Sequence, residues 1–241
     1  MKRRIIGLLA IALMAGPIPS QAMSIVISQV YGGGGNSGAT YTNDFVELFN
    51  AGSAAVDLSS FSLQYASATG TGSFSQNPVN LFPAFLLQPG QYFLVQAAQG
   101  AGGTTPLPSP DGIWSASLSA TGGKVALVSG TSGLACNGGS TPCSAAQLAL
   151  IVDLVGYGNA NFFETAAAPA LTNTTAAFRA GGGCIDTDNN AADFSTGAPA
   201  PRNRGTPRNV CSSTPAPEPG TLALLGLGLF GLGLMRRRVT E

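Results

Sequence analysis

Histidine is absent from the whole 241-residue chain. Its absence excludes the Ser-His-Asp and Cys-His schemes, in which an imidazole takes the proton from the nucleophile. It also weakens the case for a zinc site, because the four cysteines show no Cys-x-x-Cys spacing. A hydrolase built from this sequence would need a serine with a lysine base, or carboxylates that hold a metal ion.

Charged residues are scarce, at 9% of the chain. Between Met23 and Pro217 five residues are basic and nine are acidic, which gives a net charge of −4. This segment lacks the basic surface expected of a protein that binds phosphate backbones, so nucleic acid is not a favoured partner. Three arginines do cluster at its Pro-rich C-terminal edge, where we interpret them as part of a solvated linker: Arg202, Arg204 and Arg208.

The same segment has no long apolar stripe of helical period. It has instead six short runs of β-branched or aromatic residues, separated by Gly, Pro, Ser and Asn clusters, at 24–31, 44–50, 61–67, 91–97, 123–129 and 150–158. Short strands without helices between them predict an all-β fold, an antiparallel sandwich or barrel. The segment from Met23 to Pro217 has about 195 residues, a length that suits one domain.

Apolar segments lie at both ends of the chain. At the start, basic residues at 2–4 precede an apolar run at 5–15 and the small residues Ser20 and Ala22. This order predicts a secretory signal peptide over residues 1–22. The alternative, a retained membrane anchor, is weaker because the run is short and ends in a cleavage pattern.

The C-terminal segment has three parts in membrane order. A Pro-Glu-Pro turn (Pro217, Glu218, Pro219) closes a linker at 211–219, an uncharged run follows at 220–235, and the basic cluster comes last: Arg236, Arg237 and Arg238. The 16-residue run corresponds to roughly 24 Å of helix, slightly less than a bilayer core. We therefore predict a transmembrane helix and basic tail over 220–241, with the arginines in the cytoplasm.

This tail resembles the PEP-CTERM sorting signal of Gram-negative bacteria. The resemblance implies an exosortase-type protease as processing partner, transient anchoring in the inner membrane, and release or attachment at the cell surface. Such signals are common in bacteria that make exopolysaccharide, which makes exopolysaccharide or another envelope component a candidate partner. We expect the processed protein to begin near Met23 and to end between Pro217 and Gly220.

The interior resembles the lamin-tail domain in its bacterial, secreted form. The resemblance rests on "SQVYGGGGNSGATYTNDFVELFNAG", "VDLSSFSLQYAS", "GGKVALVS", "VDLVGYG" and "DTDNNAADF" followed by "PRN", and spans about residues 24–203. It implies an immunoglobulin-like antiparallel β-sandwich, which we place at 23–210. The family offers no catalytic residues to carry over. In bacteria such domains often accompany secreted nucleases or phosphatases, and the sequence shows no such partner domain.

The four cysteines are an even number in an exported chain, which favours disulfide bonds. Cys136 and Cys143 bracket a short Gly-rich loop that closes easily, and this pairing leaves Cys184 with Cys211. Four cysteines allow three pairings, and the sequence does not decide between them.

The candidate metal ligands are four oxygen-bearing residues in "DTDNNAAD": Asp186, Asp188, Asn190 and Asp193. Their spacing suits a hard cation such as Ca²⁺, the one cofactor that we consider. The match to the helix-loop-helix calcium motif fails at Ala191 and Gly197, where that motif has Gly and Glu. The alternative is an Asx-turn loop, in which these side chains cap local backbone groups.

Other candidate sites have simpler interpretations. Gly33, Gly35 and Gly38 have the spacing of a phosphate loop, but a strand follows where that motif needs a helix. Asp44 and Glu47 are a candidate carboxylate pair, although Glu47 more simply accepts from backbone donors or faces solvent.

Lys124 is the only lysine between Met23 and Pro217. We interpret it as a residue of an edge strand, where its charge blocks association with another sheet. Four aromatic residues suit either the core or a sugar platform: Tyr41, Tyr65, Trp114 and Tyr157.

Two hypotheses for function follow. The first is an exported, non-catalytic cell-surface or matrix module that binds polysaccharide, protein or the cell envelope. The second is a metal-dependent phosphodiesterase or nuclease, or an accessory to one, with Asp186, Asp188 and Asp193 as its metal ligands.

Overall fold

The structure, a computed structural model, describes residues 25–211. The predicted signal peptide, the Pro-Glu-Pro motif and the C-terminal apolar segment lie outside these residues. Among the helices of the described part, none has both the length and the apolar character needed to cross a membrane.

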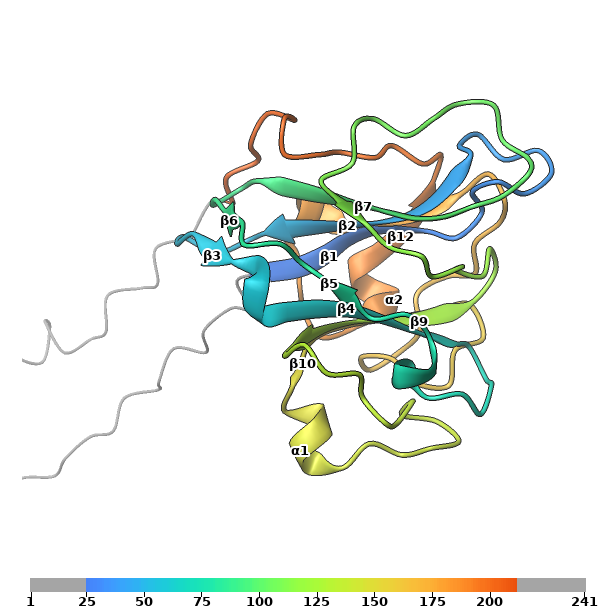
Figure 1. The fold of residues 1–241 in the computed structure, drawn as a ribbon, viewed down its shortest axis with the longest axis vertical. Helices are drawn as coiled ribbons and strands as arrows, with labels where there is room; N and C mark the ends of the chain where they lie inside the picture. Colours follow the sequence, from blue (N-terminus) through green and yellow to red (C-terminus); the bar gives the residue numbers. More distant parts are fainter. Residues whose placement is uncertain (1–24, 212–241) are drawn as a thin grey trace, which may run out of the picture.

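Two sheets lie face to face as the layers of a sandwich (Figure 1). The larger sheet has six strands in the order β12 (Phe194–Gly197), β11 (Ala176–Arg179), β1 (Ile25–Tyr31), β2 (Asn43–Asn50), β7 (Tyr92–Gln99) and β8 (Gly112–Ile113). The smaller sheet has four in the order β10 (Ile151–Tyr157), β9 (Gly123–Ser129), β4 (Phe61–Ser67) and β5 (Asn80–Leu81). All neighbours are antiparallel except β7 and β8, so the predicted immunoglobulin-like antiparallel sandwich is confirmed.

The remaining elements are short. A two-stranded ribbon pairs β3 (Val56–Asp57) with β6 (Leu86–Leu87). The helices are α1 (Ala145–Leu148), α2 (Asn190–Asp193) and three 3₁₀ turns, η1 (Leu58–Ser60), η2 (Phe74–Gln76) and η3 (Ala180–Gly183).

All six predicted strands are present, with ends that agree to within two residues. The core between the sheets is built from the inward-facing apolar residues of these strands, among them Ile27, Leu48 and Val125, all fully buried. The sequence did not predict β11 and β12, which have four residues each and extend the larger sheet beside β1.

Every residue of β1 and β2 is buried, although the other face of their sheet points away from the core. The C-terminal segment 198–211 covers that face and lies above the upper sheet in Figure 1. Arg202 is the central contact: its Nη2 donates to Glu47 Oε1 at 2.7 Å, and its guanidinium lies 4.0 Å from the ring centre of Tyr92. The interpretation of Arg202 as part of a solvated linker is therefore wrong.

Lys124 is also placed differently from the prediction. It lies on β9, between β10 and β4, and its side chain is fully buried. Its Nζ donates to the Asn137 carbonyl oxygen at 2.9 Å and to Asn161 Oδ1 at 2.8 Å, and burial lowers its pKa. The lysine holds the two loops that contain Asn137 and Asn161 against the sheet, and it does not lie on an edge strand.

Two disulfides are present, Cys136–Cys143 and Cys184–Cys211, and residues 25–211 contain no free cysteine. The favoured pairing is therefore confirmed. Cys184 and Cys211 pack beside Val26 and Tyr92, so the second disulfide fastens the end of the covering segment next to the start of β1.

We predict that protein denatured without reductant shows no reactive thiol on labelling. The Cys184→Ala/Cys211→Ala variant should lose about 3 to 4 kcal/mol of unfolding free energy, because this bond closes a loop with a sequence separation of 27. Two or more reactive thiols in the native-sequence protein would contradict the pairing.

Candidate functional site

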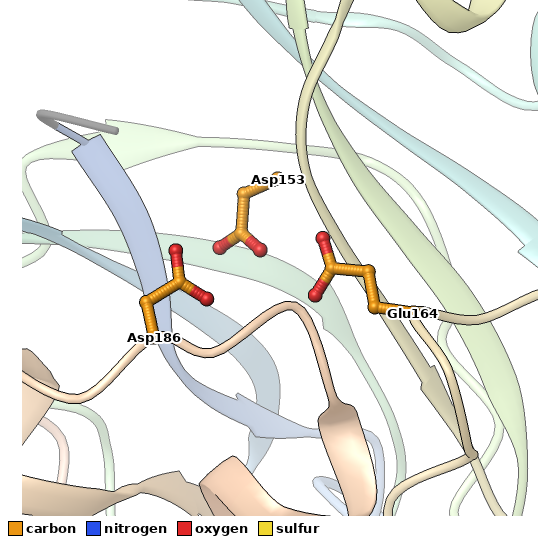
Figure 2. Close-up of side chains that lie close together, drawn as sticks. All are labelled: Asp153, Glu164 and Asp186. Atoms are coloured by element: carbon orange, nitrogen blue, oxygen red, sulfur yellow. The ribbon is translucent and has the colours of Figure 1, made fainter. Parts of the chain in front are cut away.

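Three carboxyl groups converge at one edge of the sandwich: Asp153 on β10, Glu164 in the loop after β10, and Asp186 between η3 and α2 (Figure 2). One oxygen of each lies within 4.8 Å of the others. Such a group of oxygens can hold a divalent cation, which makes it the candidate metal centre of the described residues.

Arg179, at the end of β11, provides the positive charge beside these carboxyl groups. Its Nη2 donates to both oxygens of Asp153 at 2.8 Å, and its Nη1 donates to Asp186 Oδ1 at 2.6 Å. The side chains of Arg179 and Asp153 are both fully buried, and the guanidinium also lies 4.6 Å from the ring centre of Phe194. This is a desolvated ion pair in which one guanidinium nitrogen contacts both oxygens of the carboxylate.

A bulge in β1 explains why this pair is needed. The β1–β2 register shifts between Ile27 and Gln29, and β1 pairs with β11 only from Gln29 onward. The backbone N–H and C=O of Ile27 on that side therefore have no strand partner. Asp153 Oδ2 accepts from the Ile27 N–H, and the Ile27 carbonyl accepts from Arg179 Nε at 2.9 Å. A residue of the smaller sheet thus completes the hydrogen bonding of the larger one.

The electrostatics follow from burial. Burial raises the pKa of Asp153, and the Arg179 guanidinium opposes that rise. Three N–H donors point at the Asp153 oxygens, which suits the ionised form. Burial, together with the Asp153 charge, raises the pKa of Glu164 to about 8, so Glu164 is mostly protonated at neutral pH. Burial alone would lower the pKa of Arg179, but Asp153, Asp186 and Glu164 raise it.

A divalent cation at this position would have to compete with a buried guanidinium. Glu164 also has other partners, since its oxygens accept from the Leu154 N–H at 3.1 Å and from Asn190 Nδ2 at 2.8 Å. The arrangement therefore binds β10, β11 and the 186–193 segment together, and it leaves few oxygen lone pairs for a metal or for proton transfer.

The four predicted metal ligands lie in the same region but point to different partners. Asp193 accepts from the N–H and Oγ of Thr187, and Asn190 bonds Leu154, Gly156 and Glu164. Asp186 pairs with Arg179, and Asp188 is exposed with a φ of 54°. Asp193 caps nearby groups, as the Asx-turn alternative describes, whereas Asn190 bonds residues 26 to 36 positions away. Calcium binding by these residues stays a prediction.

Asp44 and Glu47 do not form a pair. Glu47 lies on the outer face of β2, where it accepts from the Arg202 N–H at 2.7 Å and from Ser28 Oγ. It is fully buried, so of its two interpretations the backbone acceptor is right and the solvent-facing carboxylate is wrong.

Asp44 lies at the other end of β2 and lines a cleft of about 80 Å³. Its Oδ2 accepts from the Leu118 N–H at 2.9 Å, while its buried Oδ1 has no hydrogen-bond partner among the described residues. The cleft lies between the β1–β2 loop, the end of β7 and the segment before Ser119, and is lined by Gly32, Gly34, Asn36, Asp44, Ala98, Gln99, Gly100, Ser117 and Leu118.

The glycines of the β1–β2 loop permit this close packing. A Cβ at Gly34 would lie 2.0 Å from the Asn43 carbonyl oxygen, and Gly35 has a φ of 69°. The loop leads into strand β2 and not into a helix, as the sequence predicts. Of the candidate sugar platforms, Tyr65, Trp114 and Tyr157 are buried in the core, and Tyr41 is half-buried.

Sequence reasoning did not identify Asp153, Glu164 or Arg179 as partners. One signal was present: Asp153 is the only charge in the apolar run "LIVDLVGYG". A charge inside a buried strand requires a partner. That partner is Arg179, which lies 26 residues later in the chain on a four-residue strand. Only the three-dimensional structure shows that the two residues meet.

Comparisons with known proteins agree with both resemblances. A family model described as Lamin Tail Domain matches residues 18–142, and one described as PEP-CTERM protein-sorting motif matches residues 215–238. None of the curated proteins searched matches the chain. A similar solved structure is a DUF4876 family protein from Bacteroides thetaiotaomicron VPI-5482, 14% identical, with a TM-score of 0.48 over 79% of this chain and 75% of that one.

We predict that Arg179→Met lowers the unfolding free energy by about 3 to 5 kcal/mol, because it leaves Asp153 buried without its cation. The Arg179→Met/Asp153→Asn variant should recover part of this loss. The matched control is Arg204→Gln, which removes a 62% exposed arginine from Asp111 and should cost less than about 1 kcal/mol. Denaturant unfolding measures all three, and an Arg179→Met protein as stable as the control would contradict the role of the pair.

Proposed function

The chain belongs to the Lamin Tail Domain family, and from this premise we propose that it is a non-catalytic module with a binding or structural role at the cell surface or in the extracellular matrix. Its PEP-CTERM motif implies export and sorting to the cell surface or the extracellular space. The β-sandwich is thus the exported part, and the C-terminal tail is its sorting signal.

One observation carries the non-catalytic assignment: two of the three carboxyl groups best placed for metal chemistry, Asp153 and Asp186, are held by Arg179. Hydrolysis through a metal ion needs an open coordination position and an ionised ligand set. Here Asp153 is fully engaged with Arg179 and Ile27, and the oxygens of Glu164 accept from Leu154 and Asn190. The absence of histidine supports the same conclusion.

We further propose that an exosortase-type protease cleaves the tail near Pro217, after transient anchoring in the inner membrane. The Cys184–Cys211 disulfide supports this proposal, because it fixes the domain end six positions before the motif. Cleavage near Pro217 would therefore leave the contacts among residues 25–211 intact. Exopolysaccharide or another envelope component is the partner class that this route favours.

We predict that protein recovered from the cell surface or the medium begins near Met23 and ends between Pro217 and Gly220. Intact-mass measurement tests this, and a mass that retains residues 222–238 would contradict the sorting proposal. The Pro217→Ala/Glu218→Ala variant is the matched control. It should keep the tail, because the altered motif is the one that the protease would recognise.

We also predict that the purified protein does not cleave DNA above the buffer background, with or without millimolar calcium, magnesium or manganese. Agarose-gel analysis of plasmid substrate measures this directly. Metal-dependent cleavage that is lost in Glu164→Gln would overturn the non-catalytic assignment and return the nuclease hypothesis.

A further inference from the structure

We propose that the cleft beside Asp44 is a binding site for a compact cation, either a metal ion or a primary ammonium group. The site lies on β2 and the loops around it, and it shares no residue with the carboxylates around Arg179. The proposal does not depend on the export route or on the non-catalytic assignment.

The first observation is an acceptor without a donor. Asp44 is 3% exposed, and its Oδ1 has no hydrogen-bond partner within the described part of the chain. A buried polar atom left unpaired is costly, and such atoms are rare in folded proteins. The N–H of Gly34 lies near enough to influence the carboxyl group, but it does not meet the geometry of a hydrogen bond.

The second observation is the charge around Asp44. The ionisable groups that interact with it are the hydroxyls of Tyr31 on β1, Tyr65 on β4 and Tyr157 on β10. Four of the five basic residues at 25–211 have other partners: Arg179 binds Asp153, Arg202 binds Glu47, Arg204 binds Asp111, and Lys124 binds two loop oxygens. The fifth, Arg208, is exposed and is not among the groups that shift the pKa of Asp44. Asp44 is thus a buried acid without a cation from these groups.

The third observation is the size and lining of the cleft. A volume of about 80 Å³ holds an ion with one or two waters, or an ammonium group with a short stem. The lining offers amide and hydroxyl oxygens from Asn36, Gln99 and Ser117 and the backbone of the glycine-rich loop. Such oxygens bind hard cations and accept from ammonium groups, whereas a quaternary ammonium ion has no N–H to donate to them.

The acid-base behaviour agrees with this geometry. Burial raises the pKa of Asp44 to about 7, and the N–H groups of Leu118 and Gly34 oppose the rise. Because the folded pKa lies above the unfolded value, the contribution of Asp44 to stability is full at low pH and is lost as the pH rises through about 7. A cation in the cleft would bind the ionised form, so its effect should appear only above that pH.

The test is a thermal melt of the purified full chain with calcium, sodium or methylammonium chloride, against tetramethylammonium chloride at matched ionic strength. At about pH 8, at least one compact cation should raise Tm by about 3 to 6 °C when present at ten times its Kd. The rise should vanish at about pH 5, where Asp44 is protonated. A response to calcium or sodium alone assigns a metal ion, and a response to methylammonium alone assigns an ammonium group.

Two variants complete the experiment. Asp44→Asn keeps an oxygen that accepts from the Leu118 N–H, and it should abolish the rise. Asp188→Asn, which alters the exposed residue of the predicted calcium loop, should keep it. The proposal is overturned if no compact cation exceeds tetramethylammonium, if the rise persists at about pH 5, or if Asp44→Asn retains it. Should Asp44→Asn fail to fold, the pH comparison on the native sequence decides.

Discussion

The buried ion pair between Arg179 and Asp153 is the interaction on which the sandwich depends. Removing two charges from water costs several kcal/mol per ion, and only close contact with further hydrogen bonds offsets that cost. Here the further bonds are those to the Ile27 peptide, which the β1 bulge leaves without a strand partner. The pair therefore fixes the position of the bulge, the end of β11 and the approach of β10 to β1 together.

The same logic recurs elsewhere in the molecule. Glu47 and Arg202 join the outer face of the larger sheet to the segment that covers it, and Lys124 holds two loops against the smaller sheet. In a chain with only 9% charged residues, these inward-facing contacts involve a substantial share of the charges between residues 25 and 211. The fold thus uses these charges in contacts that join its two sheets and their covering segments.

The sequence predicted what depends on local pattern and missed what depends on long-range contact. Alternating apolar runs identified the six main strands, and the even cysteine count of an exported chain predicted disulfides, although the sequence did not decide their connectivity. β11 and β12 were missed because four residues carry too little pattern, and they are strands only because β1 offers an edge. Lys124 and Arg202 were misinterpreted because charge alone suggests a solvent-exposed side chain. In the structure Lys124 donates to Asn161 and Arg202 donates to Glu47, and these hydrogen bonds offset the cost of removing each charge from water. The Arg179 partners come from three separate segments, so no spacing rule could join them.

The central claim is that the carboxylates of Figure 2 serve the fold through Arg179 and do not hold a catalytic metal. The most direct measurement is a crystal structure from crystals soaked in manganese, with the metal located by its anomalous scattering. We expect Nη2 of Arg179 to remain on both oxygens of Asp153, with no anomalous peak within coordination distance of Asp153, Glu164 and Asp186. A manganese ion bound to these three residues, with Arg179 displaced, would contradict the account.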